Sequence, residues 1–245
     1  MCICGTKNDV FRITEGFMLQ PFDELPSEFQ NKAVKKYYDI LKTKKRSIIM
    51  KRIVDLIISL LLIIILLIPI IILALLIKFT SRGPVLFKQV RVTTYNRQFK
   101  IYKFRTMVCD ADKMGSHVTS LGDPRITRIG GFLRKFRLDE LPQLFNVLKG
   151  DMSIVGTRPE VPEYVARYSD AMYATLLMPA GITSLASIKF KNEDRMLEAS
   201  TNIDEDYVKI ILPKKMHYNL LYLKNFSLRN DIYLMLKTVK EVAFH

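Results

Sequence analysis

The sequence feature that most constrains the fold is an apolar run of 22 residues from Leu56 to Ile77, in which Ser59 and Pro69 interrupt a leucine, isoleucine and alanine pattern. As a helix, a run of this length crosses a hydrocarbon layer of about 30 Å. The sequence therefore predicts a membrane segment. The run begins too far from the first residue to be a secretory signal, and no cleavage site with small residues follows it, so we expect it to persist in the mature protein.

Basic residues stand at both ends of this run, and no acidic residue follows it before Asp110. Positive residues near a membrane segment stay on the cytoplasmic side, so a simple span would move one of the two clusters against that preference. A re-entrant hairpin keeps both clusters in the cytoplasm, and Pro69 supplies the bend because it lacks an amide hydrogen and clashes with the carbonyl four residues back. An ordinary span with a tolerated proline is the alternative. The basic residues are Lys42, Lys44, Lys45, Arg46, Lys51 and Arg52 before the run, and Lys78, Arg82, Lys88, Arg91, Arg97, Lys100, Lys103 and Arg105 after it.

The charge of the chain points to an anionic partner. The formal net charge is +14 and the pI is near 9.6, which suits a nucleic acid, a phosphorylated metabolite or a membrane surface. No motif that reads nucleic acid is present, so we do not expect nucleic acid as the partner. The three cysteines do not form a disulfide framework, and the three histidines lack the spacing of metal ligands.

Residues 26–45, "PSEFQNKAVKKYYDILKTKK", predict an amphipathic helix ahead of the membrane segment. Its apolar stripe would comprise Phe29, Ala33, Tyr37, and Ile40 or Leu41. Such a helix either lies on an anionic membrane surface or packs on the body of the protein, and the pattern allows both.

The remainder of the chain mixes strands and helices. "VLFKQVRV" and "QFKIYKFRTM" predict a β-hairpin with its turn at Tyr95 and Asn96. Two helices then flank a break near Arg137, because apolar residues recur at helical spacing on both sides of it. "GDMSIVGTRPEVP" reads as a loop or short strand, and the acidic run from Asp204 to Tyr207 as a solvated surface. Further helices are expected over residues 164–177 and 214–223 and from a cap at Ser227, with Ile232, Met235 or Leu236, and Val239 on one side.

These elements predict an α/β fold: a compact mixed α/β catalytic domain that carries an N-terminal re-entrant, helix-break-helix membrane segment and amphipathic interfacial helices. We divide the chain into an N-terminal extension with an amphipathic helix over residues 1–45, a re-entrant membrane hairpin over 46–82, and a cytosolic domain over 83–245.

Two adjacent carboxylates, Asp139 and Glu140, follow a cluster of arginines in "KFRLDELPQLFN". Consecutive helical residues point about 100° apart, so the two side chains are not expected to share one proton as a matched acid and base. Pro142 suits the first turn of a helix, which places Asp139 near a helix start, where exposed N–H groups favour anions. Helix capping is therefore the ordinary interpretation of this pair.

Cations near the pair suggest a different role. The pair is flanked in the sequence by the basic residues Arg134, Lys135, Arg137 and Arg158. A guanidinium group can donate hydrogen bonds to two phosphate oxygens at once. A solvated or headgroup-facing basic surface is the alternative for each of them. Carboxylates among arginines near a membrane suit Mg²⁺ and a phosphorylated substrate, because Mg²⁺ binds through one or two carboxylates plus substrate phosphates. A carboxylate can also attack phosphorus directly.

An ordered set of segments resembles one family. "KRIVD" before the proline-broken apolar run, "FKIYKFRTM", "RLDELPQLFNVLKGDMSIVGTRPE" and "YLKNFSLRNDIYLMLKT" are similar to segments of the bacterial sugar transferases, the monotopic polyprenol-phosphate phosphoglycosyl transferases. The resemblance covers residues 51–242, and its long central block is more specific than a short motif. It implies a re-entrant membrane helix at the cytoplasmic face of the bacterial plasma membrane.

The resemblance also implies a two-stage reaction. Asp139 would attack a UDP-sugar, release UMP, and pass the sugar phosphate to a polyprenol phosphate such as undecaprenyl phosphate, which starts a lipid-linked glycan. Mg²⁺ held by Glu140 would offset the negative charge. By resemblance, Arg134 and Arg158 would bind phosphate, and Lys103 and Arg105 would contact substrate.

Three departures from the family pattern stand out: Thr157 in "GTRP", Ile68 before Pro69, and "MPAGITSLASIKFKNED" without a tryptophan. The last leaves the transferred sugar open. A non-enzymatic membrane scaffold with a basic lipid-binding surface is the competing hypothesis. The sequence also leaves the oligomeric state open, a homo-oligomer included.

Overall fold

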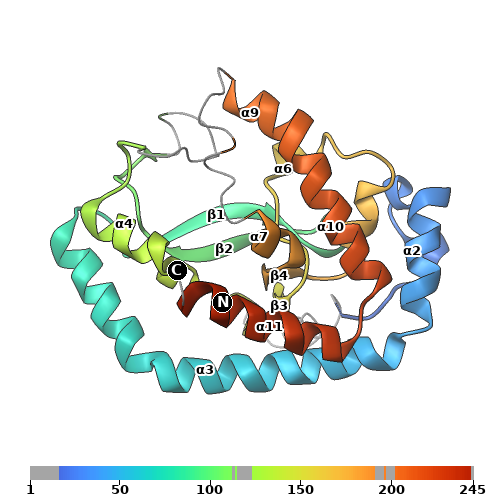
Figure 1. The fold of residues 1–245 in the computed structure, drawn as a ribbon, viewed down its shortest axis with the longest axis horizontal. Coiled ribbons are helices and arrows are strands. Elements are labelled where there is room, and N and C mark those ends of the chain that lie inside the picture. Colours follow the sequence, from blue (N-terminus) through green and yellow to red (C-terminus); the bar gives the residue numbers. More distant parts are fainter. Residues whose placement is uncertain (1–16, 112–113, 115–122, 191–195, 197–201, 244–245) are drawn as a thin grey trace, which may run out of the picture.

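The structure is a computed structural model that describes residues 17–111, 114, 123–190, 196 and 202–243. Its strands form two small sheets, an antiparallel pair β1 (Leu86–Val92) and β2 (Gln98–Phe104) and a parallel pair β3 (Met152–Val155) and β4 (Ala180–Thr183). Helices surround both sheets, and one long helix, α3, runs along one side of the body (Figure 1). The mixed helix and strand content agrees with the predicted fold class.

Helix α3 spans Lys45–Thr80 and contains the whole apolar run. It is the one helix in the described part of the chain that is long and apolar enough to cross a membrane, by length and composition alone, and 11% of its most apolar window is buried. The predicted break at Pro69 is not an interruption, because the helix continues through this residue. A proline within a helix removes one hydrogen bond and bends the axis without ending the helix. The axis of α3 does turn, and its last part rises beside α4 (Figure 1).

Buried charged residues hold the first half of α3 to the body. The Lys51 Nζ atom lies 2.6 Å from Asp231 Oδ2 and 3.7 Å from Asp55 Oδ2. Asp55 also accepts a hydrogen bond of 2.6 Å from the Ser153 hydroxyl of β3, and Asp231 accepts one of 2.9 Å from Tyr222. Buried charges are tolerated only when they are paired and hydrogen-bonded, so this cluster specifies where α3 sits.

Arg52, the next residue along α3, reaches a different helix. Its guanidinium donates hydrogen bonds of 2.7 Å to the Val147 carbonyl and 3.2 Å to the Leu148 carbonyl. Both carbonyls belong to the end of α5 (Gln143–Lys149), where a helix leaves its last carbonyl groups without partners and favours positive charge. Arg52 thus caps α5 from α3.

The second half of α3 packs through apolar side chains. Leu73 and Ile77 form a buried cluster with Phe104 of β2 and Leu133 of α4 (Arg128–Lys135). Arg105, which follows β2, donates hydrogen bonds of 2.7 Å to both the carbonyl and the hydroxyl of Ser81, and so caps the helix end. The outer side of α3 stays exposed and apolar, including Ile57, Leu60, Leu61, Ile64, Ile65, Ile68, Ile71, Ile72, Leu75 and Phe79.

The helix predicted ahead of the long apolar run is shorter than expected, and its predicted apolar stripe is confirmed in part. A 3-10 turn, η2 (Ser27–Phe29), precedes α2 (Lys32–Lys42), which Asn31 caps by accepting from the Val34 amide. Of the predicted stripe, Phe29 and Leu41 are buried and Tyr37 is partly buried against the main core, whereas Ala33 is not a core residue. The buried residues of α2 are Val34, Tyr38 and Leu41. They belong to the main core, and this helix therefore packs on the body. Another 3-10 turn, η1 (Phe22–Glu24), lies ahead of both.

The predicted hairpin is confirmed. Strands β1 and β2 pair in register from Leu86 opposite Phe104 to Val92 opposite Gln98. The turn η3 (Thr94–Asn96) contains Tyr95 and Asn96 with positive φ. At the outer edge of β2, Asn146 of α5 accepts from the Tyr102 amide and donates to the Lys100 carbonyl, both at 2.9 Å. The side chain replaces a neighbouring strand there, which fixes α5 against the hairpin.

The second sheet was only partly predicted. β3 lies in the segment read as a loop or short strand, whereas β4 was not foreseen. Glycine allows β4 to lie close to the backbone that follows β3, since a Cβ atom on Gly181 would lie 2.2 Å from the Gly156 amide nitrogen. The helix predicted over residues 164–177 is two short pieces, α6 (Pro162–Val165) and η6 (Met172–Leu176), and α7 (Leu185–Lys189) follows β4.

The C-terminal part is helical, as predicted. A short α9 (Ile203–Asp206) leads into a π-helix, η7 (Tyr207–Ile211), and then into α10 (Leu212–Lys224). The last helix, α11 (Leu228–Ala243), begins after Ser227, whose hydroxyl accepts from the Asn230 amide at 3.2 Å. On its predicted apolar side, Ile232, Leu236 and Val239 are between 52% and 66% exposed, whereas Met235 is partly buried against the main core.

The anchoring cluster generates a stability prediction. We expect Asp231→Asn to lower the free energy of unfolding by about 3 kcal/mol, because it leaves the buried Lys51 ammonium without its closest counter-charge. The matched control is Asp39→Asn, which breaks the exposed pair of Lys35 and Asp39 and should cost less than about 0.5 kcal/mol. Urea unfolding in detergent micelles measures both, and equal costs would contradict the assigned role of the cluster.

Candidate active site

The two adjacent carboxylates lie on a short turn between two helices. Helix α4 starts at a cap formed by Thr127, whose hydroxyl accepts from the Gly130 amide at 3.0 Å. The helix ends before Arg137, which adopts a left-handed conformation with φ of 55°. The chain then makes one 3-10 turn, η5 (Leu138–Glu140), before Pro142, which is the N-cap residue of α5. The predicted break near Arg137 is confirmed, and the acids sit just ahead of a helix, as the proline indicated.

Glu140 is the better-bound carboxylate of the two. It is 8% exposed, and its Oε1 atom accepts hydrogen bonds from Lys103 Nζ at 3.2 Å and from Arg158 Nη2 at 3.0 Å. Lys103 belongs to β2, and Arg158 belongs to the loop after β3. One carboxylate oxygen therefore joins three segments that are distant in the sequence.

Asp139 has a different environment. It is 7% exposed and lines a cavity, yet within the described residues no side chain or backbone group makes a hydrogen bond or ion pair with its carboxylate. Lys103, Arg134 and Arg137 act on it through their charge without bonding directly to it. A carboxylate that is attracted by cations but not hydrogen-bonded keeps its oxygen lone pairs available to a substrate atom.

The pKa values of the two acids move in opposite directions. Burial raises the pKa of Asp139, Lys103 lowers it in part, and the neighbouring Glu140 charge raises it further. Burial would also raise the pKa of Glu140, but Lys103 and Arg158 outweigh it and hold this pKa well below its ordinary range. Glu140 is thus a permanent anion, while Asp139 is the more basic oxygen of the pair.

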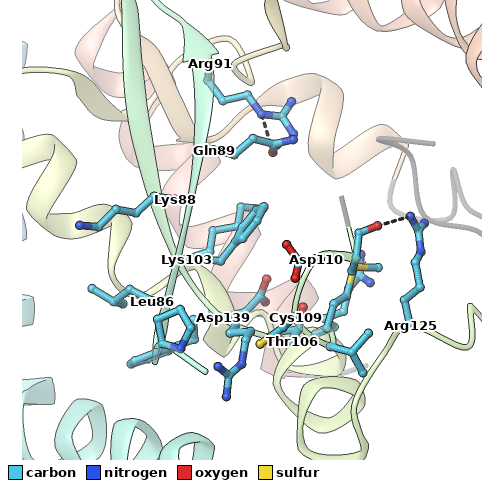
Figure 2. A pocket seen from close by; sticks show the side chains of 18 of the residues that line it. Leu86, Lys88, Gln89, Arg91, Lys103, Thr106, Cys109, Asp110, Arg125 and Asp139 are labelled. Atoms are coloured by element: carbon cyan, nitrogen blue, oxygen red, sulfur yellow. Dashed lines mark hydrogen bonds between the residues drawn. The ribbon is translucent and has the colours of Figure 1, made fainter. Parts of the chain in front are cut away.

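The cavity in front of Asp139 has a volume of about 730 Å³, within the range of pockets that hold small molecules. Its wall comes from β1, β2, the segment after β2, α4, η5, the loop after β3, α6, the start of η7 and α10. Figure 2 shows Lys103 between Asp139 on one side and Gln89 with Arg91 on the other, and Cys109, Asp110 and Arg125 on a further side. Cations dominate this lining, with Lys88, Arg91, Lys103, Arg105, Arg125, Arg134, Arg158 and Lys215.

The cavity continues to a second polar group that sequence reasoning missed. Glu160 accepts a hydrogen bond of 2.8 Å from Tyr207, and Lys215 Nζ lies 2.8 Å from the Tyr207 hydroxyl. The interpretation of residues 204–207 as a solvated surface is wrong at Tyr207, which is 3% exposed. It holds for Glu205, which is exposed, while Asp204 is half-buried and accepts from Tyr164 at 2.5 Å. Acidic composition suggested solvent there, but Glu160 directly after Arg158 and Pro159 was an available signal.

The predicted site residues separate into two groups. Lys103, Arg134 and Arg158 all line the cavity with Asp139. Arg105 also borders it, but its Nη2 atom is committed to Ser81 at the end of α3. Lys135 and Arg137 are not among the lining residues; Lys135 lies over the Phe136 ring at 5.6 Å. Pro69 lies inside α3, as described above.

The site offers few protein ligands for a metal ion among the described residues. In the described part of the chain, no group of three or more His, Cys, Asp or Glu side chains could hold a metal ion. Glu140 still fits a site with one carboxylate ligand, because the hydrogen bonds that it accepts from described residues use Oε1 and leave Oε2 without one from this part of the chain. Mg²⁺ is commonly bound this way, with substrate phosphates and water as the other ligands.

Comparisons with known proteins identify relatives. The family model of the bacterial sugar transferases matches residues 46–245. A UDP-N-acetylgalactosamine-undecaprenyl-phosphate N-acetylgalactosaminephosphotransferase of Aeromonas hydrophila is 36% identical over 197 residues, which is 79% of this chain and 43% of that protein.

For two further relatives the match spans more of the relative's length. A putative undecaprenyl-phosphate N-acetylgalactosaminyl 1-phosphate transferase of Bacillus subtilis is 44% identical over a match that spans 51% of this chain and 70% of that protein. A UDP-glucose:undecaprenyl-phosphate glucose-1-phosphate transferase of Caulobacter vibrioides is 35% identical over a match that spans 78% of this chain and 68% of that protein. In several relatives, the Aeromonas protein included, the match spans less than half of the relative's length, between 36% and 43%.

The opposite pKa shifts predict opposite effects on stability. The folded pKa of Asp139 lies above its ordinary value of 3.8, so ionisation of Asp139 costs stability at neutral pH, and this cost disappears below about pH 4. We expect Asp139→Asn to stabilise the fold by about 1 kcal/mol at pH 7.5, less as the pH falls.

Glu140→Gln is the matched comparison. The folded pKa of Glu140 lies below its ordinary value of 4.5, so its ionised form stabilises the protein above that pH. The glutamine variant should therefore lose about 2 kcal/mol at pH 7.5, because Lys103 and Arg158 lose their shared counter-charge. Unfolding at pH 7.5 and pH 5.5 compares the two, and the same sign for both would refute this account.

Proposed function

This chain belongs to the bacterial sugar transferase family, and we propose that it transfers a sugar 1-phosphate from a UDP-sugar to a polyprenol phosphate such as undecaprenyl phosphate, with release of UMP. The relatives above carry such activities in their names. The observation that supports the proposal most directly is the buried Asp139 carboxylate, which has no hydrogen bond from the described residues and faces a cavity lined by cations. The product would start the synthesis of a lipid-linked glycan.

The transfer takes two displacements at one phosphorus atom. An Asp139 oxygen attacks the phosphorus that carries the sugar, a bond forms between them, and the bond from phosphorus to the UMP oxygen breaks with its electron pair on UMP. An oxygen of the polyprenol phosphate then attacks the same phosphorus, and the Asp139 carboxylate leaves. Two displacements through a covalent intermediate replace one difficult step by two easier ones.

The surrounding charges suit this chemistry. An anionic nucleophile that approaches a diphosphate meets repulsion, and Lys103, Arg134 and Arg158 line the cavity where that charge develops. Preorganised cations in a buried site stabilise such charge more effectively than water does. Glu140 keeps Lys103 and Arg158 in place through its Oε1 atom. Mg²⁺ bound to Glu140 would neutralise phosphate oxygens and assist departure of UMP.

We further propose that α3 enters the membrane and returns, so that the protein is monotopic at the cytoplasmic face of the bacterial plasma membrane. The bend of α3 and the basic residues at both of its ends support this arrangement. The exposed apolar side of α11 lies on a helix that contacts α3 and suits an interfacial position. The acceptor phosphate sits at the headgroup level, close to a site held there.

The reaction is tested with purified protein in lipid nanodiscs, a panel of UDP-sugars and polyprenol phosphate. We expect UMP as the nucleotide product, and release of UDP would reject the proposal. Asp139→Asn should reduce turnover by at least about 1,000-fold, because the amide is nearly isosteric but a poor nucleophile. Asp39→Asn, on the exposed side of α2, serves as the control and should keep full activity.

The covalent step has its own measurement. When the donor is supplied without acceptor, intact-mass analysis after rapid quenching should find the chain heavier by one sugar phosphate, and unchanged in Asp139→Asn. A wild-type chain that remains unmodified while product accumulates would exclude the intermediate. Full turnover in Asp139→Asn would instead favour a scaffold role for this site.

Topology is a separate prediction. Single cysteines are placed at Lys42 and Arg82, both exposed and on either side of α3, in a chain without its natural cysteines. In intact cells we expect both to resist an impermeant maleimide and to react only after permeabilisation, because a re-entrant helix keeps both ends inside. Labelling of one position from outside would establish a simple span.

A further inference from the structure

The part of the cavity beyond Asp139 holds a carboxylate that the two displacements do not use. We propose that Glu160 binds hydroxyl groups on one ring of the donor, either the ribose of the nucleotide or the transferred sugar, and thereby determines how tightly the donor binds. This inference rests on the proposed function, and it assigns to the donor a second binding site separate from the reacting phosphates.

The hydrogen-bonding pattern of Glu160 leaves one oxygen for a ligand. Oε1 accepts from the Tyr207 hydroxyl at 2.8 Å and lies 3.5 Å from Lys215 Nζ. Within the described residues Oε2 accepts no hydrogen bond, and the nearest cation is Arg91 Nη1 at 3.9 Å. Glu160 lines the cavity, and sugar hydroxyls are donors that a carboxylate oxygen accepts well.

The charge of Glu160 is maintained by its neighbours. Burial would raise its pKa, but Lys215 and Arg91 outweigh burial and hold the pKa below its ordinary value. Arg91 is itself held in position, since it donates to the Pro159 carbonyl at 3.1 Å and to Gln89 Oε1 at 2.7 Å. The carboxylate is therefore ionised and oriented before any ligand arrives, which lowers the cost of binding.

Tyrosine rings form part of the same wall. The Tyr164 and Tyr207 rings lie 4.9 Å apart with an angle of 31° between their planes, and both line the cavity. Tyr207 begins the π-helix η7, an irregular form that is often found at functional sites. Flat aromatic surfaces beside a carboxylate accommodate the apolar face and the hydroxyl groups of a sugar ring together.

The position of this group matches a donor that spans the cavity. Lys103, which binds Glu140, pairs across the hairpin with Phe87 of β1. Arg91, which lies near Glu160, is four residues beyond Phe87 on β1, and this spacing along a strand corresponds to about 13 Å. Arg158 links the two places, because it bonds to Glu140 and precedes Pro159 and Glu160 in the loop. With the diphosphate near Asp139, a ring attached to it reaches towards Glu160.

The test compares Glu160→Gln with Asp231→Asn in nanodiscs. Asp231 is a buried, ion-paired carboxylate outside the cavity, so its variant reproduces the loss of a buried charge without a change to the donor site. We expect Glu160→Gln to raise the KM for the UDP-sugar by about tenfold to a hundredfold. The KM for polyprenol phosphate should change by less than about twofold, and the control should change neither.

Folding is controlled by a second variant. Glu160→Gln leaves Lys215 buried without its counter-charge, so the double variant Glu160→Gln with Lys215→Met keeps the net charge of the group unchanged. It should show the same increase in donor KM. Donor KM, UMP inhibition and sugar preference that all stay within about twofold of wild type in a folded variant would overturn the proposal.

Two further measurements distinguish the ribose from the transferred sugar. If Glu160 binds the ribose, the inhibition constant of UMP rises together with the donor KM. If it binds the transferred sugar, UMP inhibition is unchanged and the ratio of kcat/KM between UDP-glucose and UDP-N-acetylgalactosamine changes. Either result supports the proposal.

Failure of the proposed function would be recognised separately. If the wild type releases UMP from no donor, the proposed transfer is wrong, and calorimetric titration of UDP-glucose and UMP then decides the binding role. Weaker binding to Glu160→Gln than to the wild type would support it. Equal affinities, or no binding by the wild type, would reject it.

Discussion

The site depends on one carboxylate oxygen. Glu140 Oε1 accepts from Lys103 on β2 and from Arg158 after β3, so the hairpin, the turn η5 and the loop after β3 meet at a single atom. This arrangement satisfies Glu140 and leaves its neighbour Asp139 without a hydrogen bond from the described residues. Two chemically similar side chains thus differ in basicity because the cations bond to one of them and only attract the other.

The helix that carries the apolar run is joined to this site by polar contacts. Lys51 and Asp55 fix its first half to β3 and α11, and Arg52 reaches the last carbonyls of α5. Helix α5 begins just after Asp139 and Glu140, and its Asn146 side chain binds the edge of β2. The place of α3 on the body and the position of the two acids are therefore connected through Arg52, α5 and Asn146.

The cavity has two chemically distinct parts. Near Asp139 the lining supplies cations for phosphate, whereas near Glu160 it supplies a carboxylate and two tyrosine rings. Arg158 and Glu160 stand almost adjacent in the chain and serve different parts. The short segment after β3 therefore contributes to both, and the parallel pairing of β3 with β4 holds the start of this segment in place.

Local sequence determined much of this protein: the apolar run gave one long helix, the hairpin formed where β-branched and aromatic residues alternate, and Pro142 with the break at Arg137 placed the acids before a helix. These features depend on neighbours in the chain, so their pattern reveals them. Tertiary structure alone decided the continuity of α3 through Pro69, the burial of Tyr207 in an acidic run, and the exposure of Ile232 and Leu236. Each of these depends on which distant segment packs beside it. The difference between Asp139 and Glu140 has the same origin, since Lys103 and Arg158 come from elsewhere in the chain and only folding brings them to one of the two acids.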